Sequence, residues 1–598
     1  MSTTSSTQNF LKGGEFLIKE SSASQMFIPE DYSDDQLMLI DMVRDFINTR
    51  IKPNRDKIEG LDIDLTKQLL KEAGELGIIG IPFPEEYGGS EMDFITSLIL
   101  SERMAEAESF SLSFGAHTGI GMLPLLYFGT TEQKQRYLPD LVSGDKYAAY
   151  CLTEPGSGSD ALNAKSVAVH SDDGKHYILN GQKMWITNAG FADLFTVFAK
   201  IDGDKFTGFL VERNWDGVTL GAEEKKLGIK GSSTRQVFFE NVKVPVGNVL
   251  GAIGKGHKIA FNILNIGRIK LAAGAFGGSK AICSISIQYA NERIQFGKAI
   301  ATFGAIQHKI AEQAIRIFVN ETASYRLAQC IKLKEENLME DGLSMGDALL
   351  GAAEAYAVEC ALMKVHSSEC LDFVVDEGVQ IYGGMGYSEE APMAAAYRDA
   401  RINRIFEGTN EINRMLAVDR LIKSALKGEI DLMTPALNVQ QELMEKKEDK
   451  AMDESQPFTR EKQMIEGLKK AFLMTTGATV QKLMKELSKE QEILMNLSDM
   501  MAEIYLAEAA LLRTEKVSLQ DDKAKAQIYQ DMTQVFLDDA MERFTMNAKR
   551  AITSWADGEH KKLLLYGLHK LTRYEGVNTK AARRRIAARL IDANSYCF

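Results

Sequence analysis

The sequence predicts an α+β protein that is mostly helical, in which one β domain lies between two helical regions and a further helical region ends the chain. Three observations predict this class. Residues 34–149 and 256–430 show helical periodicity, residues 150–250 are rich in β-branched and aromatic segments, and neither proline nor glycine occurs from Ala478 to Asp557. We expect six parts: an N-terminal extension (1–33), an N-terminal helical domain (34–149), a central β domain (150–255), a helical domain (256–430), a linker (431–460) and a C-terminal helical extension (461–598).

The N-terminal helical domain is expected to begin near residue 34. The stretch DDQLMLIDMVRDFINTRI places apolar residues near helical spacing, at Leu37, Ile40, Val43, Ile47 and Ile51. A later helix is expected to start at Thr131, which is a plausible cap, and to stop around Pro139 and Gly144.

Short segments separated by turn signals predict the central β domain. The segments YILNG, LFTVFAK, FTGFLVE and QVFFENVKV are apolar and β-branched or aromatic. Asp-Gly and Asn-Gly pairs in SDDGKH, LNGQ and IDGDK punctuate them, as they do in hairpins.

Helical patterns return after residue 256, in GAIQHKIAEQAIRIFVNETASYRLAQCIKLKEE and in GDALLGAAEAYAVECALMKVHSSECLDFVVDEG. Pro435, Pro457 and the charged run EKKEDKAMDE then favour a linker or loop. Beyond Pro457 there is no proline and only 5 of the 48 glycines. Long helices of a separate module are therefore expected to end the chain.

Composition and spacing argue against several classes of protein. The chain has 598 residues and a net charge of −13, which disfavours a chain-wide nucleic-acid binder. We find no window with the ~18 consecutive apolar residues of a membrane span. Six dispersed cysteines and eight histidines without ligand spacing disfavour a disulfide scaffold and a metal site. The first residues resemble neither a secretory nor a mitochondrial leader, so a cytoplasmic location is expected.

Two segments of the β domain have the composition of a cofactor site. From Tyr150 to Asp160 a strand enters a loop with two glycines, two serines and no bulky residue, which lets backbone amides approach a phosphate. From Lys183 to Asn188 an aromatic plane lies beside a hydroxyl, which suits a flat ring system. Either segment alone is more often a structural turn or a core tryptophan.

Together with four later segments, these two resemble the acyl-CoA dehydrogenase family. The later segments are Leu264 to Arg268, Arg293 to Lys298, Gln380 to Gly386 and Tyr397 to Ile412. The resemblance covers roughly residues 35–425 in family order, and GIKGSSTRQVFFENVKVPVGNVLG, HKIAFNILNIGR and the helical extension are similar to the very-long-chain branch. It implies a four-helix bundle over 256–430, FAD as the cofactor, and oxidation of fatty acyl-CoA to trans-2-enoyl-CoA in β-oxidation, with electrons passed to an electron-transfer flavoprotein.

The resemblance also implies roles for individual residues. Glu407 is the expected base that removes the α proton of the acyl group, and a largely dry site would raise its pKa. Some family branches carry the base just before the arginine that matches Arg268, but that position is Gly267 here. The implied cofactor-binding residues are Tyr150, Leu152, Thr153, Ser159, Trp185, Thr187, Arg293, Phe296, Gln307, Gln380, Gly384, Thr409 and Glu411, and the implied substrate-binding residues are Ser159, Asn265 and Arg268. Because Arg293, Phe296, Gln307, Gln380 and Gly384 match residues that reach a neighbouring subunit's flavin, a homodimer is expected.

Alternatives remain open at this stage. An acyl-CoA oxidase, in which oxygen reoxidises the flavin, fits the same motifs, and so does a non-catalytic scaffold with this fold. Long acyl chains are favoured because the segment Phe114 to Gly121 holds three glycines that leave room for a tail, although Pro124 could restore a barrier.

The last part of the chain is strongly basic. Residues 558–592 carry nine bases and three acids. Intramolecular or dimer packing against acidic patches is the favoured interpretation, peripheral contact with an anionic membrane is the second, and nucleic acid is disfavoured because stacking aromatics are absent.

Overall fold

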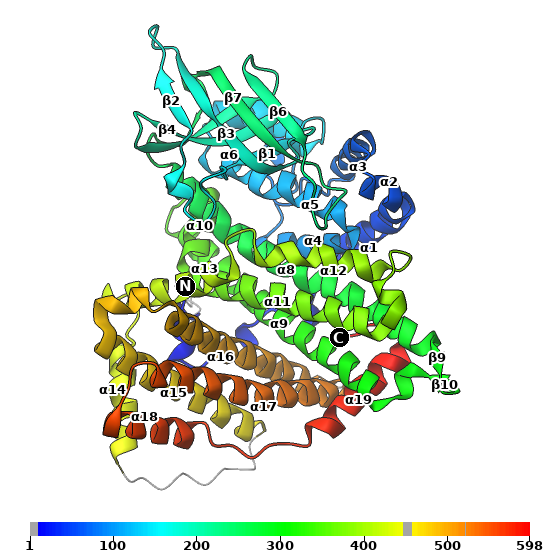
Figure 1. The fold of residues 1–598 in the computed structure, drawn as a ribbon, viewed down its shortest axis with the longest axis vertical. Coiled ribbons are helices and arrows are strands. Elements are labelled where there is room, and N and C mark those ends of the chain that lie inside the picture. Colours follow the sequence, from blue (N-terminus) through cyan, green and yellow to red (C-terminus); the bar gives the residue numbers. More distant parts are fainter. Residues whose placement is uncertain (1–9, 446–456, 521) are drawn as a thin grey trace, which may run out of the picture.

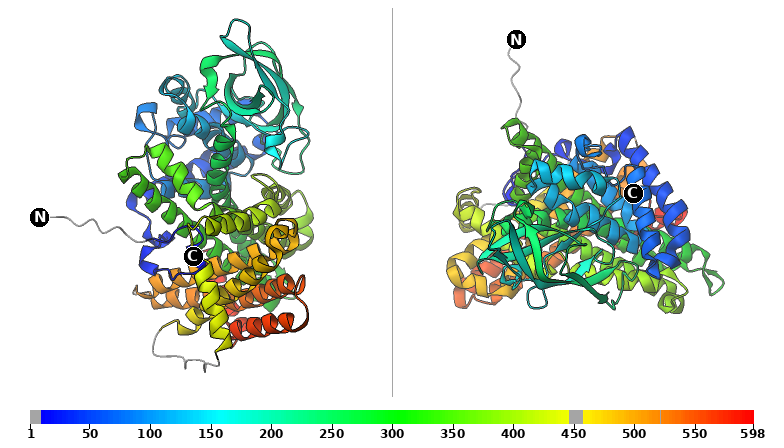
Figure 2. Two further views of the ribbon diagram at one scale, coloured as in Figure 1. Left: turned by 90° about the vertical axis from the view of Figure 1, so that its left-hand side faces the viewer. Right: turned by 90° about the horizontal axis from the view of Figure 1, so that it is seen from above.

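In the computed structural model, the β domain and the C-terminal helices lie at opposite ends of the molecule, with the other helices between them (Figure 1). The side view in Figure 2 shows the same order. The structure describes residues 10–445, 457–520 and 522–598. This arrangement confirms the predicted mostly helical α+β class.

Residues 10–33, which we call the N-terminal strap, form three short 3₁₀ turns: η1 (Glu15–Leu17), η2 (Ala23–Gln25) and η3 (Pro29–Asp31). Its Phe16 and Leu17 are buried, and the Phe16 ring packs edge-on against Tyr505, with 4.9 Å between ring centroids. The strap is therefore part of the core that it shares with the C-terminal helices.

The N-terminal helical domain has seven α-helices among the described residues: α1 (Asp34–Phe46), α2 (Arg55–Glu59), α3 (Ile63–Glu75), α4 (Phe94–Met104), α5 (Ser109–Gly115), α6 (Leu123–Phe128) and α7 (Thr131–Val142). Ser33 caps α1, which continues as a π-helix over Ile47–Ile51. Ile40, Val43, Ile47 and Ile51 are buried as predicted. Leu37 is 47% exposed, contrary to the prediction, because Gln36 fills that turn's inward position and donates to Thr96.

The prediction for α7 was right for its first residue and for its end near Gly144, but wrong for its cap and for Pro139. Its cap is Thr130, one residue before Thr131, and the Thr130 hydroxyl accepts from the Gln133 amide. Pro139 lies inside the helix rather than ending it. It is exposed, so the backbone carbonyl that loses its partner faces solvent, while buried Leu138 and Leu141 hold the next turn in place.

The central β domain contains β1 (Ala148–Cys151), β2 (Val167–His170), β3 (His176–Thr187), β4 (Leu194–Ile201), β5 (Lys205–Glu212), β6 (Val218–Glu223), β7 (Thr234–Pro245) and β8 (Val249–Leu250). Their order in the sheet is β6-β7-β3-β2-β4-β5-β8, and β1 pairs in parallel with β4. The register of β3 against β7 shifts between Lys183 and Ile186. This irregularity places Trp185 at a φ of 57° and turns its side chain out of the sheet's core.

The helical domain consists of α8 (Gly256–Glu292), α9 (Gly304–Glu340), α10 (Met345–Ala355), α11 (Ala357–Tyr382), α12 (Pro392–Ala400) and α13 (Asn410–Leu426). Helix α8 packs against α11, α9 and α4, and α13 packs against α11. By length and composition α8 could cross a membrane, but most of its apolar window is buried in the bundle. A hairpin of β9 (Ile294–Gln295) and β10 (Lys298–Ala299) connects α8 to α9.

The C-terminal helices are α14 (Met433–Met444), α15 (Thr459–Leu483), α16 (Gln491–Ser518), α17 (Lys523–Thr553), α18 (Gly558–Leu571) and α19 (Thr579–Ala593). The predicted linker over 431–460 is wrong for α14. Pro435 lies in the first turn of that helix, where its missing N–H would have no partner, and Asp431 accepts from the Thr434 amide. Most of the charged run EKKEDKAMDE lies outside the described residues. The long helices expected between Ala478 and Asp557 are confirmed.

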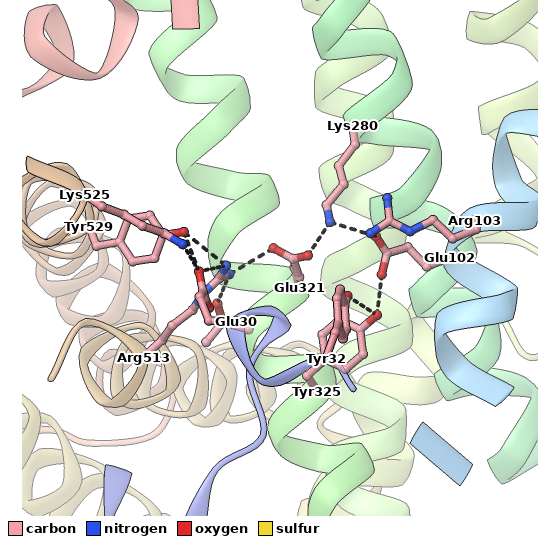
Figure 3. A network of polar contacts seen from close by, with 11 residues as sticks. Glu30, Tyr32, Glu102, Arg103, Lys280, Glu321, Tyr325, Arg513, Lys525 and Tyr529 are labelled. Carbon is pink, nitrogen blue, oxygen red and sulfur yellow. Dashed lines mark hydrogen bonds and ion pairs between the residues drawn. The ribbon is translucent and has the colours of Figure 1, made fainter. Parts of the chain in front are cut away.

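A buried network of charges joins the C-terminal helices to the rest of the molecule (Figure 3). The fully buried Arg513 on α16 donates to Glu30 of the strap (Nη2 to Oε1, 2.9 Å) and to Glu321 on α9 (Nη1 to Oε2, 2.9 Å). Lys280 on α8 pairs with Glu321 and, 2.7 Å away, with Glu102 on α4. Alternating charges therefore run from α16 through the bundle into the N-terminal domain.

The basic segment at the end of the chain packs on acidic side chains. Arg583 on α19 donates to Glu312 on α9 and to Asp539 on α17, each at 2.6 Å. Arg585 makes a two-bond ion pair with Asp531 on α17. For these two arginines the intramolecular interpretation is confirmed, and peripheral membrane contact remains a prediction.

Candidate active site

A cavity of about 520 Å³ lies between the N-terminal helical domain and the bundle. Helix α8 lines it for more than five turns, from Ile263 to Ile285. Most of the lining is apolar, contributed by α4, by α5 and the π-helix that follows it (η8, Ala116–Gly121), and by α11 and α12. Thr187 at the end of β3 and Glu407 bring polar groups to this cavity.

Glu407 lies on a short loop before α13 that many contacts hold in place. Its φ is 58° and that of Gly408 is 83°, so two successive residues adopt the left-handed conformation. The Asn413 side-chain amide donates to the Gly408 carbonyl (2.8 Å) and to the Thr409 carbonyl (3.1 Å), and Lys364 Nζ donates to the Gly408 carbonyl (2.7 Å). Thr409 caps α13 by accepting from the Ile412 amide. These bonds fix a strained backbone that aims Glu407 at the cavity.

The carboxylate of Glu407 faces Gly267 across the cavity wall. A Cβ at Gly267 would lie 3.0 Å from Glu407 Oε2, so any side chain there would crowd the carboxylate. Oε2 is buried and has no hydrogen-bond partner among the described residues. Burial raises the pKa of Glu407, and the positive charges of Arg268 and then Lys364 oppose that rise. The carboxylate is thus available to accept a proton from a group in the cavity.

Two predicted residues, Arg268 and Asn265, lie beside this carboxylate. Arg268 is buried, and its Nη1 donates to Asn265 Oδ1 at 2.7 Å, while its Nε has no partner in the described part of the chain. Burial lowers the pKa of Arg268, and Glu407 opposes that change. Tyr150 on β1 is also buried with an unpaired hydroxyl, and burial together with the charge of Glu407 raises its pKa.

The predicted flavin-binding segments lie together at the end of β1 and on β3. Lys183 ties them: its Nζ donates to Glu154 (2.7 Å) and to the Leu152 carbonyl (3.2 Å), and the Met184 amide donates to the Thr153 carbonyl. The Lys183–Glu154 ion pair and the Met184–Thr153 backbone bond together fix the loop that carries Leu152, Thr153 and Ser159 against the irregular part of β3.

These segments fit a flavin. Trp185 is 60% exposed, which leaves an aromatic face free at the surface of the β domain. Nothing lies within 4 Å of a Cβ built on Gly156 or on Gly158, so there is open space beside a loop rich in amides and hydroxyls. Thr187, two residues after Trp185, reaches the cavity that holds Glu407. These residues would hold a flavin at the cavity that Glu407 also lines.

A second group of predicted residues lies apart from this cavity within the chain. Arg293 and Phe296 are on the β9–β10 hairpin, where Phe296 is 93% exposed. Gln380 lies in the last turn of α11 and Gly384 lies in η12 (Gly383–Tyr387), both exposed, and Gln307 is half-buried in the first turn of α9. The stacked rings of Tyr289 and Tyr382 hold the hairpin's base beside η12. Glu411 is exposed in the first turn of α13.

The sequence analysis missed the residues that support Glu407. Lys364 and Asn413 hold the carbonyls of its loop, and Asn410 accepts from Lys364 at 2.8 Å. Asn410 directly follows the Gly408-Thr409 pair and Asn413 lies three residues further on, so their positions were a usable signal. No local sequence signal pointed to Lys364, because it lies 44 residues before Gly408 on a different helix.

Comparisons with known proteins agree with this geometry. Four family models match, each described as part of acyl-CoA dehydrogenase: the N-terminal domain over residues 33–145, the middle domain over 149–242, and C-terminal domains over 254–422 and 467–570. The chain is 46% identical to a probable acyl-CoA dehydrogenase of Bacillus subtilis, over 98% of both chains.

Two further comparisons concern the branch of the family and the cofactor. The chain is 43% identical to the mitochondrial very long-chain specific acyl-CoA dehydrogenase of Rattus norvegicus, over 60% of this chain and 53% of that one. An acyl-CoA dehydrogenase from Bacillus anthracis, solved in complex with FAD, superposes with a TM-score of 0.95 at 44% identity, covering 98% of this chain and 100% of the other.

Proposed function

The chain belongs to the acyl-CoA dehydrogenase family and is an FAD-dependent enzyme of it, and we propose that it oxidises long-chain fatty acyl-CoA to trans-2-enoyl-CoA in β-oxidation. We further propose that an electron-transfer flavoprotein receives the electrons and that the active unit is a homodimer. The single observation that carries the reaction is the buried, unpaired carboxylate of Glu407 at the wall of a large apolar cavity.

In this proposal Glu407 removes the proton from the α carbon of the thioester. A carboxylate does this well when its surroundings are dry, because desolvation makes it a stronger base. Arg268 and Lys364 favour its charged form and so oppose the rise in pKa that burial causes. Bound FAD supplies the acceptor for the hydride that leaves the β carbon. The absence of a side chain at Gly267 keeps the Glu407 carboxylate from being crowded on that side.

The preference for long chains is supported by glycines along the cavity. Gly115 and Gly119 of the N-terminal domain line it, and no atom lies within 4 Å of a Cβ built on either. Gly274 and Gly278 on α8 line it too, and a Cβ at either would meet only ordinary contacts. Space that side chains would otherwise fill is thus left for a tail. Pro124, which could have blocked this end, lies inside α6 and is buried away from the lining.

The homodimer is supported by the exposed residues on the hairpin and η12. Phe296 and Tyr387 are apolar or aromatic, strongly exposed and located at adjoining ends of α8 and α11. Arg293 beside them suits a charge-assisted bond to a pyrophosphate. We propose that these residues contact a second copy's flavin, so that Phe296→Asp should convert a dimer into a monomer with weakened FAD retention in size-exclusion chromatography.

The test of the base is Glu407→Gln, which keeps the side-chain shape and removes the proton acceptor. With hexadecanoyl-CoA under argon, the wild type should bleach its flavin, and the variant should do so at least roughly 100-fold more slowly while still binding FAD. Glu559→Gln, on a side chain 88% exposed, is the matched control and should behave as wild type. A Glu407→Gln variant that bleaches at near the wild-type rate would show that the base lies elsewhere.

The same preparation separates the alternatives. Hydrogen peroxide produced under air at the rate of substrate turnover would favour an acyl-CoA oxidase over a dehydrogenase. Purified protein without flavin absorbance would favour a scaffold role. Reduction of an added electron-transfer flavoprotein under argon is the outcome that the proposal requires.

A further inference from the structure

The cavity contains one cation that no partner neutralises. Three basic residues line it: Lys52, Arg55 and Lys270. Lys52 lies 3.5 Å from Glu106, and Arg55 lies 2.6 Å from Glu108. Lys270 on α8 makes no hydrogen bond or ion pair with any residue in the described ranges, and burial lowers its pKa to about 8. An ammonium group in an apolar wall without a counter-charge is unfavourable unless a ligand supplies one.

Lys270 stands where the main cavity meets a smaller one. The second pocket, of about 180 Å³, shares four lining residues with the first: Pro82, Ser97, Ile266 and Lys270. Ser97 on α4 is buried, and its hydroxyl has no hydrogen-bond partner among the described residues. Two unpaired polar groups therefore occur in the same short piece of wall, and both can donate a hydrogen bond.

The acidic residues that line the second pocket form no ion pair with Lys270. Asp93 accepts from Lys332 at 2.7 Å and caps α4, and Glu336 lies 4.0 Å from the same lysine. Glu91 and Glu335 are the remaining acids. Glu91 is exposed to solvent, and burial, Glu336 and Asp93 raise the pKa of Glu335 to about 7, which favours its neutral form. No acid contributes to the pKa of Lys270, which responds to burial alone.

The position of Lys270 relative to the Glu407 carboxylate determines which part of a bound acyl group its ammonium can contact. Gly267, whose face the Glu407 carboxylate approaches, is three residues earlier on α8, so the two positions are neighbours on one helix face. The thioester end of the acyl group must stay beside Glu407. A group that meets Lys270 must therefore be carried on the acyl chain beyond the α and β carbons.

Resting on the proposed function, we propose that Lys270 and Ser97 bind a carboxylate on the acyl chain, so that the enzyme accepts mono-CoA thioesters of dicarboxylic acids. The carboxylate accepts from the ammonium and the hydroxyl together, as charge-assisted bonds in a dry site. A plain methylene chain leaves both donors unpaired. Lys270 is thus a specificity-determining residue for the acyl group.

The experiment compares plain and carboxylated substrates of the same enzyme. We would measure kcat/KM by flavin bleaching for hexadecanoyl-CoA and for mono-CoA thioesters of alkanedioic acids of graded length. In the wild type, one length of the dioic series should be oxidised within tenfold of hexadecanoyl-CoA. Lys270→Met should lose at least tenfold on that thioester, mainly in KM, and keep or improve its rate on hexadecanoyl-CoA, whereas Lys270→Arg should retain the dioic activity.

Two further variants keep the test decisive. Ser97→Ala should raise KM for the dioic thioester with kcat unchanged, which supports the site even where Lys270→Met folds poorly. Lys332→Met removes a lysine that lines only the second pocket and should leave the ratio of the two substrates unchanged. Equal losses on both substrates in Lys270→Met, or no dioic activity at any length, would overturn this inference alone. No bleaching with either substrate would refute the proposed function and the inference with it.

Discussion

Replacing Arg513 with methionine tests whether the buried network holds the C-terminal helices on the bundle. Arg513 makes a two-bond ion pair with Glu30 and another ion pair with Glu321, and its side chain is fully buried. Methionine keeps most of the apolar stem, so the loss is electrostatic. Removing one partner of a buried ion pair destabilises a protein by about 3–5 kcal/mol. Lys525 and Lys280 still face Glu30 and Glu321, which places our expectation at about 3 kcal/mol.

The assay is hydrogen exchange of backbone amides in α16 and α17, read by mass spectrometry. A loss of about 3 kcal/mol corresponds to roughly a hundredfold faster exchange there, because each 1.36 kcal/mol is a factor of ten. Exchange in the β domain, which lies far from α16 and α17 (Figure 1), is the internal control. Arg513 also holds the pKa of Glu30 well below its ordinary 4.5. The stabilisation that Glu30 provides is therefore present above pH 4.5 and is lost as the pH falls below 4.5. The stability of Arg513→Met should fall less over the same pH range, because the variant lacks the cation.

The outcome that refutes this reasoning is a variant whose α16 and α17 amides exchange within threefold of wild type. A companion variant, Arg513→Met with Glu321→Gln, removes a buried carboxylate together with its cation. It should exchange more slowly than Arg513→Met alone, because less uncompensated charge stays buried. If the amides of the double variant exchanged as fast as those of Arg513→Met or faster, the cause would be lost packing rather than unpaired buried charge.

Three other predictions concern the cavity and its surroundings. Gly119→Leu should lower kcat/KM for hexadecanoyl-CoA at least tenfold and spare octanoyl-CoA, because the new side chain fills the open end of the cavity; equal effects on both would refute the long-chain proposal. Lys364→Met should lower kcat roughly tenfold and move the acid limb of the pH–rate profile upward, because a cation that lowers the pKa of Glu407 is lost; an unmoved limb would exclude that role. His117 should be neutral in the fold, with Nε2–H donating to the Leu141 carbonyl and Nδ1 accepting from the Ala148 amide, and its pKa falls to about 4 from 6.5. Stability should therefore be full above pH 6.5 and fall by about 3 kcal/mol towards pH 4 in urea titrations, a fall that His117→Gln should lack.

Patterns with a local cause were predictable from the sequence, and long-range pairings were not. The fold class and the helices between Ala478 and Asp557 follow from composition and periodicity, and the choice of Glu407 rather than position 267 as the base follows from the family resemblance. The missed residues lie close to residues that are far away in the chain: Lys364 holds Gly408 from another helix, and Ser97 and Lys270, from two different domains, line the same cavity. A hydroxyl or an ammonium carries no local sign of whether it will be paired.

Errors at element boundaries have the same physical origin. Pro435 and Pro139 suggested breaks, yet both lie in helices, because one is in a first turn and the other faces solvent. Proline breaks a helix only where it removes a bond that nothing replaces. Phe296 and Gln380 are exposed in the single chain, as the proposed contact with a second copy requires.

The network around Arg513 also sets an order of events during synthesis. Glu30 and Arg513 are 483 residues apart, and at about 5–20 residues per second the ribosome needs roughly 25–100 s to pass from one to the other. Glu30 has no Arg513 to pair with for that time, and Phe318 on α9, which is 195 residues before Arg513, lacks for roughly 10–40 s the guanidinium that later covers its ring at 4.8 Å. The nascent bundle therefore presents an uncovered apolar and acidic face until α16 emerges. Binding of a chaperone to the nascent chain should be strongest in this interval.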